Sequence, residues 1–228
     1  MRLLLTSGGV TNSSIEAALV DLLGKPIAES NALLIPTAIR PFPGGAALAW
    51  KTISGQLPPP LSELGWKSLG VLELTALPTI DVDSWVPEVR EADALLVGGG
   101  HVRYLSYWLR KSGLANLLPS LCGTVYVGVS AGSIAATPYN CDAEWNHRFL
   151  RSDSEVAQEP DRPLGLVDFT LYPHLYRTDM PPTPLSEMQE WASGVPVPTY
   201  AMDDETAIKV TDGDVEVISE GDWELFNP

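Results

Sequence analysis

The chain has 228 residues, of which 45% are hydrophobic and 19% charged, so it can bury one sizeable core and lacks the composition of a disordered protein. We therefore expect a single domain over residues 1–228. The 14 basic and 29 acidic side chains give a formal charge of -15, which repels phosphate backbones and anionic headgroups and predicts that neither nucleic acid nor a membrane is a partner.

The first half of the chain alternates short apolar runs with amphipathic segments. Residues 3–6 predict a buried strand, and the following Gly8-Gly9 turn ends this run before a signal-peptide core could form. A helix is expected over 13–23, with Ser13 and Glu16 as a capping box. A strand is expected at 32–35, and a short helix near 46–54 lies in a Pro- and Gly-rich stretch that is expected on the surface and has no assigned chemistry. A strand at 71–74 and a helix at 83–91, capped by Asp83, are expected to follow.

Two later strands end in runs of small residues. The strand at 94–97 leads into Gly98-Gly99-Gly100, and the strand at 124–129 leads into Ser130-Ala131-Gly132. The alternation with amphipathic helices indicates an α/β fold with a mostly parallel central sheet covered on both faces, a three-layer sandwich. Ligands bind beyond the carboxyl ends of such strands, so both turns should share one crevice. Further elements are expected as a strand at 166–171, a helix at 186–192, and strands at 199–202, 207–210 and 215–218, the last two joined by an Asp212-Gly213 turn.

The segment Gly128-Val129-Ser130-Ala131-Gly132 matches the nucleophile-elbow pattern, in which small residues let the chain turn sharply from strand to helix. Such a turn projects the Ser130 hydroxyl from the sheet and points the Ala131 N–H at a forming oxyanion. Gly99 or Gly100 is the expected second oxyanion donor, because Gly98-Gly99-Gly100 lacks the spacing of a dinucleotide-binding loop. The structural alternative is an ordinary strand–helix junction with a capping serine.

A serine nucleophile needs a general base, and the chain has three histidines: His101, His147 and His174. His174 follows a predicted strand and Pro173, which favours a loop at the sheet edge and makes it the expected base. His101 should also lie in the crevice, whereas His147 falls in a polar stretch.

The acid that orients the base stays open at this point. Asp204 and Glu205 follow a predicted strand, whereas Asp142 and Glu144 lie between serine and histidine, as in α/β-hydrolases. At least three predicted strands follow His174, and this order argues against the α/β-hydrolase fold.

These motifs together resemble the peptidase E (aspartyl dipeptidase) family of serine peptidases, which is related to cyanophycinases. The matching segments, in chain order, are Gly98-Gly99-Gly100, Gly128-Val129-Ser130-Ala131-Gly132, Leu164-Gly165-Leu166 with Tyr172-Pro173-His174, and Met202-Asp203-Asp204-Glu205-Thr206-Ala207. The resemblance implies a class I glutamine amidotransferase-like (flavodoxin-like) fold, a Ser130 nucleophile, a His174 base and an acid at Asp204 or the adjacent Glu205. It also implies a peptidase that acts near the amino terminus of short peptides without a metal or cofactor.

The chain departs from that family in two places that bear on the substrate. His101 stands where the family commonly has asparagine, which would reshape the substrate end of the crevice. Residues 183–192 lack the arginine of aspartyl dipeptidases. Arg177 is the candidate substitute, with a surface residue as the alternative, so strict Asp-X specificity is not carried over.

Two other functional hypotheses remain from the sequence: a hydrolase of non-peptide amides or esters, and a catalytically silent binding domain on the same fold. The two cysteines, Cys122 and Cys141, have neither metal-ligand spacing nor a disulfide framework, which predicts a cytoplasmic protein. The oligomeric state stays open between a monomer and a homodimer.

Overall fold

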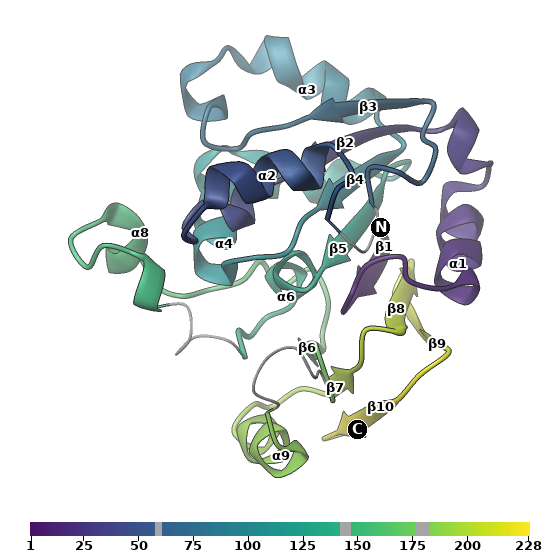
Figure 1. Ribbon diagram of the computed structural model, residues 1–228, viewed down its shortest axis with the longest axis vertical. Helices are drawn as coiled ribbons and strands as arrows, with labels where there is room; N and C mark the ends of the chain where they lie inside the picture. Colours follow the sequence, from purple (N-terminus) through teal and green to yellow (C-terminus); the bar gives the residue numbers. More distant parts are fainter. Residues whose placement is uncertain (58–60, 142–146, 177–182) are drawn as a thin grey trace.

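The computed structural model describes residues 1–57, 61–141, 147–176 and 183–228 (Figure 1). Its main element is a seven-stranded sheet with the strand order β3-β2-β4-β5-β1-β8-β9. The strands of this sheet are β1 (Arg2–Thr6), β2 (Asn31–Ile35), β3 (Ser68–Val71), β4 (Ala94–Val97), β5 (Val125–Val129), β8 (Thr206–Thr211) and β9 (Asp214–Ser219).

The five strands from β3 to β1 in this order are parallel, whereas β8 and β9 are antiparallel to their neighbours. The loops that follow β1, β2, β4 and β5 therefore all leave from one edge of the sheet, the carboxyl edge. At β8 and β9, the Asp212-Gly213 turn has positive φ at both residues, as expected of a tight hairpin.

Helices cover both faces of the main sheet (Figure 1). The described helices are α1 (Ser13–Leu23), α2 (Gly45–Ile53), α3 (Val82–Glu91), α4 (Val102–Lys111), α5 (Leu114–Leu117), α6 (Ala131–Ala136), α8 (Glu155–Gln158) and α9 (Leu185–Ser193). Side chains alternate along each strand, so Leu4 packs with α1 on one face while Leu3 and Leu5 pack with α3 to α6 on the other. Both faces are buried, which explains the continuously apolar central strands.

A second, three-stranded sheet has the order β10-β7-β6 and carries α9 beside it (Figure 1). Its strands are β6 (Thr170–Tyr172), β7 (Thr199–Met202) and β10 (Trp223–Phe226). The chain passes from β7 directly into β8 of the main sheet through residues 203–205, so this connection joins the two sheets.

Several predicted element boundaries were wrong. The strand expected at 71–74 lies at Ser68–Val71, because β3 is a half-exposed edge strand and the buried Leu72 and Leu74 follow its end. The strand expected at 166–171 is reduced to Thr170–Tyr172, and the preceding Val167 and Phe169 enter the core from a loop.

Two predicted helix caps were also wrong. The cap of α1 is Asn12, whose side chain accepts a hydrogen bond from the Ile15 N–H, and not Ser13. The cap of α3 is Asp81 and not Asp83. None of the helices in the described ranges is long and apolar enough to cross a bilayer.

Candidate active site

Ser130 lies at the carboxyl end of β5, where the chain reverses into α6. Its backbone has φ 49° and ψ -110°, a conformation that L-residues rarely adopt. The Ser130 N–H donates to the Thr6 carbonyl at 3.0 Å, which ties the turn to β1. A Cβ on Gly132 would lie 2.0 Å from the Val97 carbonyl oxygen, so only glycine allows α6 to start this close to β4. This geometry is that of a nucleophile elbow.

Tyr126 supports the elbow from within the core. Its hydroxyl donates to the Gly132 carbonyl at 2.7 Å, and the side chain is fully buried in β5. Burial raises the pKa of Tyr126, so the hydroxyl stays protonated and remains a donor. The turn is therefore held by the sheet and by a side chain beneath it.

His174 meets the Ser130 hydroxyl, as the sequence predicted. The Ser130 Oγ and His174 Nε2 atoms are 2.8 Å apart. His174 follows β6 in a backbone conformation with φ 64°, so its position also depends on a strained turn. An uncharged Nε2 at this distance can accept the serine proton.

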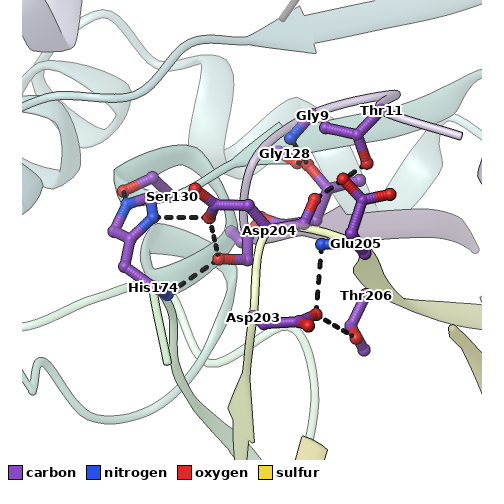
Figure 2. Close-up of polar contacts among 12 residues, drawn as sticks. Gly9, Thr11, Gly128, Ser130, His174, Asp203, Asp204, Glu205 and Thr206 are labelled. Carbon is purple, nitrogen blue, oxygen red and sulfur yellow. Dashed lines mark hydrogen bonds and ion pairs between the residues drawn. The ribbon is translucent and has the colours of Figure 1, made fainter. Parts of the chain in front are cut away.

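Asp204 contacts the other ring nitrogen of His174. The Nδ1 and Asp204 Oδ1 atoms are 2.7 Å apart (Figure 2). Glu205 lies on the far side of Asp204, where its carboxylate accepts from the Asn12 side chain. Of the two acids that the sequence left open at this position, the structure brings Asp204 to His174 and leaves Glu205 away from it.

The loop that carries Asp204 is fixed by short hydrogen bonds. Asp203 accepts from the Glu205 N–H at 3.1 Å and from the Thr206 hydroxyl at 2.7 Å (Figure 2). The Thr11 hydroxyl donates to the Asp204 carbonyl at 2.8 Å. The carboxylate therefore sits on a braced connection between β7 and β8.

Ser7 is a site residue that the sequence analysis missed. Its hydroxyl donates to Asp204 Oδ1 at 2.7 Å and accepts from the His174 backbone N–H at 2.8 Å. Ser7 is fully buried directly after β1. Its position in the sequence could have indicated this role, because a polar residue directly after a central parallel strand lies at the edge where such sheets bind ligands.

The expected oxyanion donors lie around Ser130. A Cβ on Gly99 would be 3.4 Å from the Ser130 Cβ, so the glycine turn after β4 lies against the serine. Gly100 has φ 139°, and a Cβ there would lie 2.4 Å from the Ala38 carbonyl oxygen, which restricts the position to glycine. Among the described residues, the N–H groups of Gly99, Gly100 and Ala131 have no hydrogen-bond acceptor.

The structure places His101 in the interior. It is fully buried at the start of α4, where Nδ1 accepts from the Tyr104 N–H at 3.2 Å and caps the helix. This position favours a structural role, and its expected contact with substrate stays a prediction. Arg177, Asp142 and Glu144 lie outside the described residues. Among the residues that are described, no group of three or more His, Cys, Asp or Glu side chains is arranged to hold a metal ion.

Comparisons with solved structures identify the fold. A protein from Listeria monocytogenes EGD-e that is assigned to peptidase E matches with a TM-score of 0.66 and 20% identity, over 96% of this chain and 98% of the other. A peptidase from an acI-B1 Actinobacterium matches with a TM-score of 0.62 and 19% identity, over 99% of this chain and 93% of the other. These matches confirm the predicted α/β fold of the class I glutamine amidotransferase-like type.

The family comparison covers most of the chain. No curated protein matches this sequence. The model of peptidase family S51, however, matches residues 3–218, which include both glycine-flanked turns, His174 and Asp204. This match confirms the resemblance seen in the sequence motifs. The chain thus belongs to peptidase family S51 and is a serine peptidase.

Proposed function

We propose that this protein hydrolyses short peptides, as a dipeptidase or aminopeptidase-like enzyme, with Ser130 as nucleophile, His174 as general base and Asp204 as the orienting acid. The observation that supports this most is the continuous hydrogen-bonded chain from Ser130 Oγ through both ring nitrogens of His174 to Asp204, with distances of 2.8 and 2.7 Å. A capping serine in an ordinary junction has no need of such partners.

In the acylation step, His174 Nε2 takes the Ser130 proton while Oγ bonds to the carbonyl carbon of the substrate. The resulting oxyanion is stabilised by the N–H of Ala131 and that of Gly99 or Gly100. Asp204 stabilises the imidazolium that forms. The C–N bond then breaks, the imidazolium gives its proton to the leaving amine, and an acyl-enzyme remains on Ser130.

In the deacylation step, His174 takes a proton from a water molecule that attacks the acyl carbon. The acid product leaves as the proton returns to Ser130 Oγ. The net reaction consumes one amide and one water and gives an acid and an amine, with no other reactant.

Covalent labelling tests the nucleophile. A fluorophosphonate should add to Ser130, and intact-mass spectrometry should show this adduct on the native protein and none on Ser130→Ala. His174→Ala should lower the hydrolysis rate by about 100-fold or more, since general-base catalysis is worth this much. His147→Ala is the matched control and should stay near the native rate. A folded protein without the adduct would favour the silent binding domain instead.

A substrate profile separates peptides from other acyl substrates. Dipeptides and tripeptides with a free amino terminus should be hydrolysed faster than non-peptide amides. Preferential cleavage of non-peptide amides or esters would support the alternative hydrolase and contradict the peptide assignment.

A further inference from the structure

A pocket beside Ser130 has no part in the steps above. It has a volume of about 160 Å³ and opens where β2, β4 and β5 end, with walls that include Gly98, Gly99 and Val129. Gly99 lies against the Ser130 side chain, and Val129 is the residue before it. We call this space the α2 pocket, because Thr52 of α2 forms part of its wall. Its position next to the reacting hydroxyl makes it a candidate substrate subsite.

The lining of the α2 pocket is apolar. Apart from glycine backbone and one hydroxyl, its wall consists of the side chains of Pro36, Ile39, Leu57, Leu61 and Val129. The one hydroxyl is that of Thr52, and it donates to the Leu48 carbonyl of its own helix at 3.0 Å. In its described lining, the pocket therefore offers a substrate side chain dispersion contacts, and the one side-chain hydroxyl is already engaged in a hydrogen bond.

The charges around the α2 pocket disfavour an acidic side chain. None of the described residues that line it is charged. Arg40 follows the lining residue Ile39, but its guanidinium binds the Glu73 carboxylate, with Nε and one terminal nitrogen at 3.0 and 2.7 Å. An unpaired carboxylate loses its hydration in an apolar pocket without compensation, which is strongly unfavourable.

The strand order assigns the α2 pocket to one side of the scissile bond. β4 and β2 lie on one side of β5, whereas β1 and β8 lie on the other. Ser7 directly follows β1, and Asp204 lies just before β8 in the β7–β8 connection. The pocket is on the β4 side, and His174 is held on the β1 side through its contacts with Ser7 and Asp204. His174 must reach the leaving amine, so the opposite flank is left for the acyl part of the substrate.

We infer that the α2 pocket binds an apolar side chain, of the leucine, methionine or phenylalanine class, on the residue whose carbonyl Ser130 attacks. This assignment rests on the proposed peptidase function. The size is suitable, since an aliphatic- and aromatic-lined cavity of about 150 Å³ accommodates benzene. Shape and apolar contact thus replace the charge recognition that an acidic residue would need.

Peptide hydrolysis by the full-length protein tests the preference. The substrates are Leu-Ala, Phe-Ala, Gly-Ala and Asp-Ala, the corresponding tripeptides with a second alanine, and the reversed peptide Ala-Leu. The expected kcat/KM for Leu-Ala is about 10- to 100-fold above that for Gly-Ala, because the free energy of burying a leucine side chain corresponds to a rate ratio of this size. Asp-Ala should be no better than Gly-Ala, and Ala-Leu should gain little from its leucine.

Substitutions at Thr52 test the pocket itself. Thr52→Phe should fill it and lower the ratio of kcat/KM for Leu-Ala to that for Gly-Ala by about tenfold or more. Thr52→Arg should raise the ratio of Asp-Ala to Leu-Ala hydrolysis by about tenfold, because it introduces a cation for the carboxylate. Lys51→Phe is the matched control, since Lys51 is exposed on the same helix outside the pocket lining, and should keep the native profile.

Fluorophosphonate labelling of Ser130, measured in parallel, separates the possible failures. A protein that labels and cleaves peptides but prefers Asp-Ala, or prefers Ala-Leu over Leu-Ala, overturns the pocket assignment and leaves the proposed function standing. Thr52 variants that fold, as shown by thermal unfolding, but keep the native profile also overturn the assignment. A native protein that neither labels nor cleaves any peptide overturns both proposals.

Discussion

Replacing Ser7 by alanine should reduce catalysis without removing any group that reacts. The Ser7 hydroxyl holds two parts of the site at once: it donates to the Asp204 carboxylate and accepts from the His174 backbone N–H. In Ser7→Ala the carboxylate keeps its contact with Nδ1 but loses a second donor to the same oxygen, and the backbone at His174 loses an anchor. We therefore describe Ser7 as a positioning residue.

The magnitude follows from the bonds that are lost. A hydrogen bond to a charged group is worth about 1.5–3 kcal/mol, and Ser7→Ala should lower the free energy of unfolding by about this amount. If most of that energy serves to align the imidazole, kcat falls by about 10- to 100-fold, since each 1.36 kcal/mol is tenfold in rate. KM should change by less than about threefold, because Ser7 is buried and does not reach the α2 pocket.

The assay is steady-state hydrolysis of the best peptide substrate, together with denaturant unfolding. Ser30→Ala is a matched control: Ser30 is fully buried, its hydroxyl donates to the Pro26 carbonyl at 3.0 Å, and it precedes β2 at the opposite edge of the sheet. This variant should lose stability and keep its kcat. Native kcat in Ser7→Ala, or an equal loss of kcat in both variants, would refute a positioning role.

Two further predictions concern carboxylates. Asp204→Asn should lower kcat by about 100-fold or more, because it removes the carboxylate that orients the imidazole. Glu205→Gln should keep kcat within about twofold of the native value. A larger loss of kcat in Glu205→Gln than in Asp204→Asn would assign the acid to Glu205. Burial alone raises the pKa of Asp93, but the Lys25 ammonium at 2.8 Å and the Asn31 N–H outweigh it, so the pKa lies below its usual value. A lowered pKa in the folded state stabilises the fold above the unfolded-state pKa, and this stabilisation disappears as pH falls through the folded-state pKa. The free energy of unfolding of Asp93→Asn should therefore be about 1 kcal/mol lower than that of the native protein at neutral pH and equal to it at strongly acidic pH. Denaturant titrations at both pH values measure this difference, and an equal loss of stability at the two would contradict the proposed origin.

Local sequence patterns could predict a part of the site where the residues in the pattern themselves produce its geometry. Small residues around Ser130 are needed because Gly132 approaches the β4 backbone, so the elbow is visible in the sequence. The apolar β4 and β5 are buried on both faces, which made the parallel sheet predictable. The choice of His174 followed from the small number of histidines in the chain.

The parts that could not be predicted depend on contacts between distant segments. Ser7 and Asp204 are 197 residues apart, and nothing near either residue indicates their hydrogen bond. The segment with α2 looked like a surface excursion because of its Pro and Gly content, yet Thr52 and Leu57 line the pocket beside Ser130. The sequence analysis missed β10, because this strand is a stretch of four residues that includes the charged Glu224. Its conformation is specified by pairing with β7.

The two sheets contribute different halves of the candidate machinery. Ser130 and the glycine turn belong to the main sheet, whereas His174 follows β6 and Asp204 follows β7 of the small sheet. A partial opening that separates the small sheet would disconnect the candidate base and acid from the serine, and it must first break the packing of Leu171 in β6 and Met202 in β7 against the core of the main sheet. Resistance to heat inactivation should therefore depend on the side chains that the two sheets bury between them.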